Sequence, residues 1–184
     1  MVQDTNTTIV VRKAVLDDVV HKHQIHKVVN AAYRAEGGWT TEKDLVHGER
    51  STIEDIENHI KDQVNILILA FETKGNNGDQ EERVVGTIQI QHANEEEAEL
   101  GLLSVDPSLQ SKGIGGKLVR AALKEMKEER HYLRAVMHLL EVRTEILVWY
   151  KKLGFEPTGE RIPFVWPALL KIPDTHFITL KKTL

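Results

Sequence analysis

Three glycines and two lysines lie together in the stretch LQSKGIGGKL, directly before a run with helical periodicity. The backbone at Gly113, Gly115 and Gly116 can approach a ligand closely, because glycine has no Cβ. The first N–H groups of a helix have no internal acceptor and carry partial positive charge. Lys112 and Lys117 add two cations. This combination predicts an anion site, and its row of donors suits a pyrophosphate better than a single carboxylate.

Two common phosphate-binding loops fit this stretch poorly. A P-loop needs a glycine five residues before its Gly-Lys pair and a Ser or Thr after it, where this sequence has Ser111 and Leu118. A dinucleotide-binding fingerprint needs glycine at the position of Leu118, and its strand runs directly into the loop. The remaining alternative is a glycine-rich helix start without a ligand, because a lone glycine loop is a weak signal.

Alternating and helical runs of hydrophobic residues predict the elements that position this loop. We expect strands at 8–12, 65–72, 83–91, 98–105, 134–142 and 176–180, and helices at 17–33, 51–63, from Gly113 onward and at 145–153. A capping box of Ser51 and Glu54 begins the second helix. Glycines, asparagines and charges at 74–82 predict a solvated turn within a hairpin.

The order strand, helix, strand over residues 98–142 forms a βαβ unit, so its two strands should be parallel with a right-handed crossover. The other strands are joined by hairpins, which makes the sheet mixed and the fold class α/β (an α+β mixed sheet). Such a sheet binds ligands outside the carboxyl ends of its parallel strands. Residues 106–116 should lie there.

Length and composition favour one domain over residues 1–184, with a flexible N-terminus at about 1–7. The chain is 41% hydrophobic and 28% charged, enough to bury a core. No apolar run approaches the ~20 residues of a membrane span, and the N-terminus has no signal-peptide pattern. We therefore expect a soluble, cytoplasmic protein without a membrane partner.

The residues that are absent or few exclude several kinds of chemistry. The sequence has no cysteine, which excludes disulfides, thiolate zinc sites and a cysteine nucleophile. His21, His23 and His26 cluster on the first predicted helix, but no second pair at metal spacing supports them, so we expect no metal site. The net charge of −4 argues against nucleic acid as a partner and leaves amine substrates open.

The stretch LGLLSVDPSLQSKGIGGKL resembles motif A of the GNAT superfamily of acyl-CoA N-acyltransferases, a Q/R-x-x-G-x-G/A signature matched at Gln110, Gly113 and Gly115. VRKAVLDD resembles the family's first strand and turn, and WYKKLGFEPTGE resembles its motif B. The resemblance covers roughly residues 9–182 and looks closest to a poorly characterised branch of small GNAT proteins. It implies a GNAT-like fold, with a central mixed sheet flanked by helices and the parallel βαβ unit at the cofactor site.

The resemblance also implies a site for acetyl-CoA. In this family the loop amides hold the pyrophosphate of coenzyme A, and the preceding strand binds the pantetheine arm through its main chain. The cofactor-binding residues so implied are Leu103, Ser104, Val105, Gln110, Ser111, Lys112, Gly113, Ile114, Gly115, Gly116 and Lys117. We add Arg143. In the family an asparagine often contacts the pantetheine arm near this position, and this sequence lacks it. The segment RTEILVW is also about three residues shorter than is common in the family. In the alternative interpretation Arg143 is a surface cation and Thr144 a helix N-cap.

Acyl transfer to an amine needs a base for the amine, a donor for the oxyanion and a proton for the leaving thiolate. Tyr150 matches the motif B tyrosine that lies near the sulfur in many members, and a phenol can donate that proton. Its spacing with Ile146, Trp149 and Leu153 also fits a packed helical face. Glu99 is the candidate base, although an acidic run is often a solvated turn and proton removal through water is a rival.

Acceptor recognition is expected in GGWTTEKDL, a region that commonly overhangs the acceptor end in this family. Trp39 offers a flat apolar wall, and Glu42 can pair with an ammonium group. The alternative is a short capped helix whose acids favour its N-terminus.

The expected function is transfer of an acetyl group from acetyl-CoA to a primary amine by direct attack in a ternary complex. The acceptor is a small-molecule or peptide amine, and the protein is a monomer or homodimer. Three alternatives remain: transfer of a larger acyl group, a degenerate domain that binds acyl-CoA as a sensor or interaction module, and a catalytically silent partner in an assembly.

Overall fold

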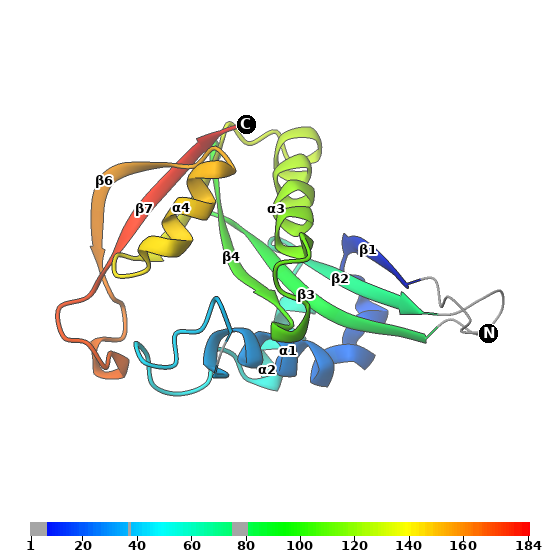
Figure 1. Cartoon of the computed structure of the whole chain (residues 1–184). Coiled ribbons are helices and arrows are strands. Elements are labelled where there is room, and N and C mark those ends of the chain that lie inside the picture. Colours follow the sequence, from blue (N-terminus) through cyan, green and yellow to red (C-terminus); the bar gives the residue numbers. More distant parts are fainter. Residues whose placement is uncertain (1–6, 37, 75–80) are drawn as a thin grey trace.

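A computed structural model of the chain describes residues 7–36, 38–74 and 81–184 (Figure 1). Residues 1–6 of the expected flexible N-terminus and most of the expected turn at 74–82 lie outside the described residues, while Thr7 already belongs to the first strand. Within them, one sheet has the strand order β1-β2-β3-β4-β5-β7-β6. Its strands are β1 (Thr7–Lys13), β2 (Ile66–Lys74), β3 (Glu81–His92), β4 (Glu97–Val105), β5 (Arg134–Leu140), β6 (Glu156–Pro163) and β7 (His176–Thr183).

Strand pairing confirms the predicted mixed sheet. The first four strands pair antiparallel in sequence order, so β2 and β3 form the expected hairpin. β4 and β5 are parallel, as the βαβ unit requires. β7 pairs antiparallel with both β5 and β6, so the last strand lies inside the sheet and β6 lies at its edge.

Four α-helices cover the two faces of the sheet in the described chain: α1 (Lys22–Arg34), α2 (Ile53–Lys61), α3 (Ile114–Lys124) and α4 (Thr144–Lys152). α1 and α2 lie on one face and α3 and α4 on the other (Figure 1). None of the described helices is long and apolar enough to cross a membrane.

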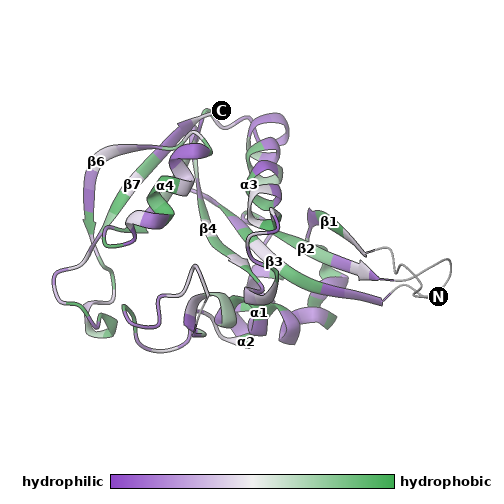
Figure 2. Cartoon of the chain, viewed as in Figure 1, coloured by the Kyte–Doolittle hydropathy of each residue, from purple (hydrophilic) through white to green (hydrophobic). Residues whose placement is uncertain are grey.

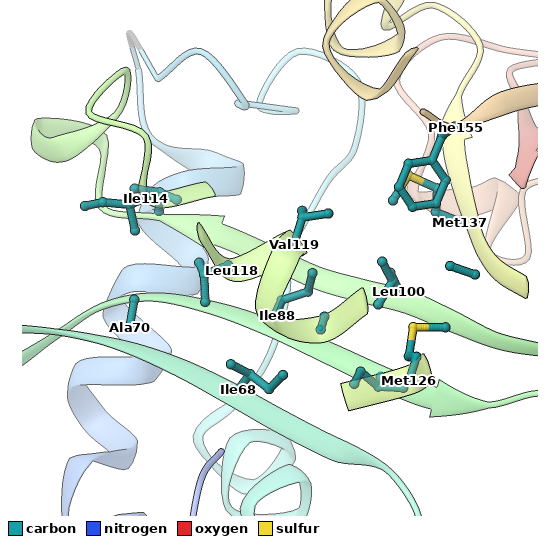
Figure 3. Close-up of a cluster of buried hydrophobic side chains, with 14 of the residues drawn as sticks. Ile68, Ala70, Ile88, Leu100, Ile114, Leu118, Val119, Met126, Met137 and Phe155 are labelled. Atoms are coloured by element: carbon teal, nitrogen blue, oxygen red, sulfur yellow. The ribbon is translucent and has the colours of Figure 1, made fainter. Parts of the chain in front are cut away.

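Each face has its own hydrophobic core. Ile25 and Ile56 pack beneath α1 and α2 against Leu69 of β2. On the other face, Leu118 and Val119 of α3 lie over β3 and β4 (Figure 3). α3 approaches the sheet closely at Gly86 of β3, where an added Cβ would lie 2.9 Å from Leu118 and 2.8 Å from a backbone oxygen. A larger residue at this position would push α3 outward.

Two helix starts differ from the sequence prediction. The helix expected from residue 17 begins with a 3₁₀ turn, Leu16–His21, before α1. Asp18 fixes this turn, because its carboxylate accepts hydrogen bonds from the Val15 amide (2.7 Å) and from the Arg12 guanidinium (2.7 and 2.8 Å). The capping box of α2 uses Thr52 and Asp55, one residue after the predicted pair.

Two further differences from the sequence analysis lie in the C-terminal part. The N-cap of α4 is Arg143, and Thr144 is already helical. β6 was not predicted at all, because its sequence EPTGERIP has no alternation of hydrophobic residues and is largely hydrophilic (Figure 2). An edge strand with exposed side chains needs no such alternation, and prolines are tolerated at an edge.

The sheet opens between its two parallel strands. β4 and β5 pair only where residues 97–99 lie beside residues 134–136, and the strands then diverge. A bulge in β4 follows, since Gln89 pairs with Gly101 but Thr87 pairs with Ser104. The bulge reverses the alternation of side chains, so that later residues of β4 face the gap.

Leu102 lies at this bulge with a left-handed φ of 49°, which costs about 1–3 kcal/mol for a residue other than glycine. The buried hydroxyl of Thr87 stabilises the conformation by donating to the Leu102 carbonyl (2.6 Å). Thr87 also hydrogen-bonds the Ser104 hydroxyl (2.6 Å). The gap between β4 and β5 is therefore held open by a specific local structure.

Candidate active site

A cavity of about 430 Å³ occupies the gap between β4 and β5. Its walls come from α1, the loop that follows it, β4, the start of α3, β5, α4 and β7. One end, here named the glycine end, is lined by Gln110, Ser111, Gly113, Ile114, Gly115 and Gly116. The other, here named the polar end, is lined by Tyr33, Glu42, His138 and Tyr150.

The cavity passes from one face of the sheet to the other. Leu139 belongs to the core beneath α3 and α4, so its neighbour His138 projects from β5 toward the face of α1 and α2. Both residues line the cavity. A ligand bound at the glycine end can therefore reach groups on the opposite face through the gap.

Backbone geometry at the glycine end favours an anion. Gly113 is the N-cap of α3 with φ 80°, and Ser111 also has a positive φ of 63°. The first main-chain bond of α3 runs from the Lys117 amide to the Gly113 carbonyl (3.1 Å), which leaves the preceding amides without helical acceptors. The turn from left-handed to right-handed backbone forms a concave set of N–H donors.

The predicted cofactor residues fall into two groups. Eight of them line the cavity: Leu103, Val105, Gln110, Ser111, Gly113, Ile114, Gly115 and Gly116. Lys112 and Lys117 are exposed beside the loop and do not line it, so they contribute long-range positive charge. Ser104 is buried, and its hydroxyl hydrogen-bonds Thr87 rather than facing the cavity.

Gln110 joins the glycine end to the loop after α1. Its Oε1 accepts from the Trp39 amide (2.8 Å), and its Nε2 donates to the Thr40 hydroxyl (3.1 Å) and the Val105 carbonyl (3.3 Å). Trp39 and Thr40 also line the cavity. The glutamine of the glycine motif thus sets the position of the facing wall.

Arg143 stabilises the same wall from α4. Its guanidinium donates to the backbone carbonyls of Trp39 (3.1 Å) and Thr40 (3.3 Å) and to the Glu145 carboxylate (2.6 Å). The residue is only 5% exposed and does not line the cavity. Each of its three guanidinium nitrogens already donates to protein, which favours positioning of this loop over contact with a cofactor.

Tyr150 faces the cavity from α4. Its ring packs against Trp149 (4.9 Å between centroids) and Phe155 (6.0 Å), which fixes its orientation. The hydroxyl makes no hydrogen bond to another described residue. Burial raises the pKa of Tyr150 well above its ordinary value, with the nearby Glu42 adding to the shift. The phenol therefore stays protonated and free to donate.

The two predicted acceptor-binding residues both line the cavity. Trp39 is 45% exposed and packs edge-on against Trp149 at 6.0 Å. Glu42 accepts from Arg34 at 3.4 Å. Burial raises the pKa of Glu42, although Arg34 and two further arginines oppose the shift.

Glu99 does not line the cavity. Its carboxylate lies 3.7 Å from Nε2 of His138, and that imidazole does line it. Sequence reasoning missed His138, together with Tyr33 of α1 and Phe177 of β7. Alternation along β5 and β7 could have assigned the two strand residues to one face, but it could not show that this face opens into the cavity.

Comparison with known protein families finds a match to the middle of the chain. The family model described as acetyltransferase (GNAT) domain matches residues 75–157. No curated protein matches the chain. Within the described residues there is no cluster of three or more His, Asp or Glu that could hold a metal ion.

Many solved N-acetyltransferases share the fold. An N-acetyltransferase from Thermoplasma acidophilum, solved with coenzyme A, is 18% identical over 96% of this chain and 99% of its own, with a TM-score of 0.67. A GNAT family acetyltransferase from Elizabethkingia anophelis with acetyl-CoA bound is 19% identical over 96% of this chain and 98% of its own, with a TM-score of 0.60. A spermidine/spermine N-acetyltransferase from Vibrio cholerae is 14% identical over 95% of this chain and 92% of its own, with a TM-score of 0.64.

These matches agree with the structure in each of its main features. The matched region contains β3, the bulged β4, the glycine loop, α3, β5 and α4, which together form most of the cavity wall. The structural matches extend over nearly the whole chain. Residues 75–157 therefore match a GNAT acetyltransferase domain, and the chain as a whole has the fold of the solved N-acetyltransferases.

Proposed function

We propose that this protein transfers the acetyl group of acetyl-CoA to a primary amine. One observation carries the proposal. A single cavity joins a row of backbone donors on one side of the sheet to ionisable side chains on the other, through the gap between β4 and β5. This arrangement lets an acyl donor and an amine meet from opposite faces.

The residues of the glycine end fit coenzyme A. Glycine at 113, 115 and 116 keeps side chains away from the loop, and the free amides of α3 match a pyrophosphate. Leu103 and Val105, turned into the gap by the bulge, line the path that the pantetheine arm would follow. Acetyl-CoA supplies the activated acetyl group, while the protein residues bind, orient and move protons.

The polar end suits an amine. Glu42 offers a carboxylate beside the aromatic walls of Trp39 and Tyr33, a combination that attracts an ammonium group. Tyr150 provides a protonated phenol that can donate to the leaving sulfur. Direct attack is the simplest route, because the sequence has no cysteine to carry an acyl intermediate. Relatives named for amine acceptors support this class of substrate.

Calorimetric titration with acetyl-CoA, free CoA and succinyl-CoA tests the first half of the proposal. The matched variants are Gly115→Ala and Gly115→Glu. A Cβ at Gly115 would lie 3.6 Å from Trp149, so alanine is accommodated and should bind nearly as well as the wild type. Glutamate places bulk and negative charge among the donors, and we expect at least about a 100-fold loss of affinity. The Gly115→Glu variant must keep the wild-type circular dichroism spectrum.

Amine-dependent release of CoA tests the second half, with polyamines, an aminoglycoside and short peptides as acceptors. Turnover with at least one amine supports the proposal. Tight binding of acetyl-CoA without turnover of any amine would favour an acyl-CoA sensor. Absence of binding would show that the glycine loop is a helix start and would overturn the proposal. A preference for succinyl-CoA would point to transfer of a larger acyl group.

A further inference from the structure

We propose that His138 accepts the proton of the acceptor ammonium group, with Glu99 and Thr179 as residues that position the imidazole. The inference rests on the proposed acetyl transfer and assigns its base. It differs from the prediction that Glu99 acts on the amine directly, because the imidazole and not the carboxylate lines the cavity.

Contacts on three sides hold the imidazole at the polar end. Nδ1 of His138 lies 3.2 Å from the Thr179 hydroxyl of β7. Nε2 lies 3.7 Å from Oε2 of Glu99 on β4. The ring also packs in a tilted orientation against Phe177, with 6.4 Å between centroids. The imidazole therefore bridges the two strands that diverge around the cavity.

These contacts leave one nitrogen able to accept a proton. When Nδ1–H donates to the Thr179 hydroxyl, Nε2 keeps its lone pair. The 3.7 Å separation of Nε2 from Glu99 is too long for a direct hydrogen bond, so Nε2 can accept from a proton donor in the cavity. Once Nε2 is protonated, the nearby carboxylate stabilises the imidazolium.

Glu99 is available to stabilise the imidazolium, whereas Glu97 on the same face of β4 is not. Glu97, two residues earlier, accepts from Arg134 (2.6 Å) and from Lys181 (2.8 and 3.0 Å). These bonds lower the pKa of Glu97 and compensate its charge. Among the described residues, Glu99 has no Lys or Arg ion-pair partner and faces His138 alone.

The other charged and titratable groups around the imidazole are compensated or neutral. Lys181 on β7 and Arg134 on β5 are paired with Glu97. Across the cavity, burial raises the pKa of Tyr33 and of Tyr150, so both phenols are neutral. Glu42 is the remaining carboxylate in the cavity wall, and it accepts from an arginine.

The proton balance follows from these assignments. The ammonium nitrogen gives one proton to Nε2 of His138, and the freed lone pair forms the C–N bond to the thioester carbonyl carbon. The C–S bond breaks with its electron pair on sulfur, which takes a proton from the Tyr150 hydroxyl. The second proton lost by nitrogen restores the phenol, and His138 releases one proton to solvent per turnover.

The test compares pH profiles of kcat/KM for an amine that the wild type acetylates. The variants are His138→Gln, Glu99→Gln and Thr179→Val, and the matched control is Glu95→Gln. We expect His138→Gln to lower kcat about 100-fold. The substitution should also remove the acidic limb of the pH profile, where wild-type activity falls as the imidazole is protonated. Glu99→Gln should shift that limb to lower pH, since the imidazolium loses its neighbouring carboxylate. Glu95→Gln removes an exposed carboxylate that pairs with no Lys or Arg among the described residues, so it should leave the limb unmoved.

The outcomes separate this inference from the proposed function. Acetyl-CoA should bind each variant within about twofold of wild type, because the substituted residues lie away from the glycine end. A wild type that binds acetyl-CoA but acetylates no amine contradicts both the function and this inference. A wild type that turns over, with His138→Gln keeping the same kcat and the same limb, contradicts the inference alone. Thr179→Val, which removes only the Nδ1 partner, should lower kcat without abolishing the limb.

Discussion

The two ends of the cavity are built from different parts of the polypeptide. At the glycine end the groups suited to a ligand are main-chain amides, and the nearby lysines lie outside the cavity wall. At the polar end the groups are side chains that come from α1, its following loop, β5 and α4. One end depends on backbone conformation, and the other depends on the placement of separate side chains.

This difference determines what can disturb each end. Main-chain amides do not titrate and persist whatever side chains surround them, so only bulk or charge in the loop can remove the anion site. The loop that carries Trp39 and the polar-end residue Glu42 keeps its position through specific hydrogen bonds. Gln110 and Arg143 supply these bonds to the loop that bears Trp39. Substitutions should therefore separate cofactor binding from acceptor handling.

Tyr150→Phe should give the largest such separation. Removing the hydroxyl leaves the sulfur without its donor, so we expect kcat to fall about 100-fold while acetyl-CoA affinity changes less than about twofold. The packing against Trp149 and Phe155 is preserved by phenylalanine. Steady-state kinetics with calorimetry measures both quantities. Tyr132→Phe removes a hydroxyl that bonds His92 outside the cavity and serves as the control. Equal kcat for wild type and Tyr150→Phe would remove the proposed role.

Arg143→Met should act on the acceptor. The substitution removes the bonds to the Trp39 and Thr40 carbonyls, so the loop loses its attachment to α4. We expect the acceptor KM to rise about 10-fold, with acetyl-CoA affinity nearly unchanged. The control is Arg161→Met, which removes a surface arginine paired with Glu141. A loss of acetyl-CoA affinity equal to the change in KM would instead place Arg143 at the cofactor.

Gln110→Leu should affect both ends, because this side chain links them. Its amide bonds the Trp39 amide on one side and the Val105 carbonyl at the end of β4 on the other. We expect about a fivefold weakening of acetyl-CoA binding and a similar rise in acceptor KM. Gln63→Leu, at an exposed position, is the control. An effect confined to one end would show that the two ends are not coupled through Gln110.

The glycine end could be predicted from the sequence because the residues that form it are close together in the chain. Gly113 and Gly115 act within one turn of chain, and their spacing with Gln110 is visible in a single motif. Tyr150 was also selected from a short segment, and the structure places it in the cavity wall. The hairpin and the parallel βαβ unit followed from the order and periodicity of hydrophobic runs. These features need no knowledge of distant contacts.

The polar end could not be predicted to the same extent. His138 and Thr179 lie on neighbouring strands 41 residues apart in sequence, and their pairing depends on the final strand entering the middle of the sheet. Leucine at position 102 gives no signal of a left-handed bulge. The bonds of Arg143 to residues 103 and 104 positions away could not be inferred from its place before α4.

Glu42→Gln should give the smallest effect, a change in stability that depends on pH. This dependence distinguishes the polar end, which has titratable side chains, from the glycine end. Burial raises the pKa of Glu42 above its ordinary value of 4.5, so the folded protein keeps a proton that the unfolded chain has already lost. Stability contributed by this site therefore falls as pH rises through that interval. Glutamine does not titrate, and the variant should gain thermal stability relative to wild type as pH rises from about 4 to about 7.

Thermal unfolding of both proteins across this interval measures the difference. The control is Glu36→Gln, because Lys43 lowers the pKa of the exposed Glu36 and so predicts the opposite sign. If wild type and Glu42→Gln instead kept a constant difference in Tm, the carboxylate would carry no cost of burial. A difference in Tm that grows with pH would mean that the charged Glu42 carboxylate destabilises the fold. Such a cost is expected if this carboxylate binds the acceptor amine. The glycine end has no titratable side chain in its wall and should impose no such cost.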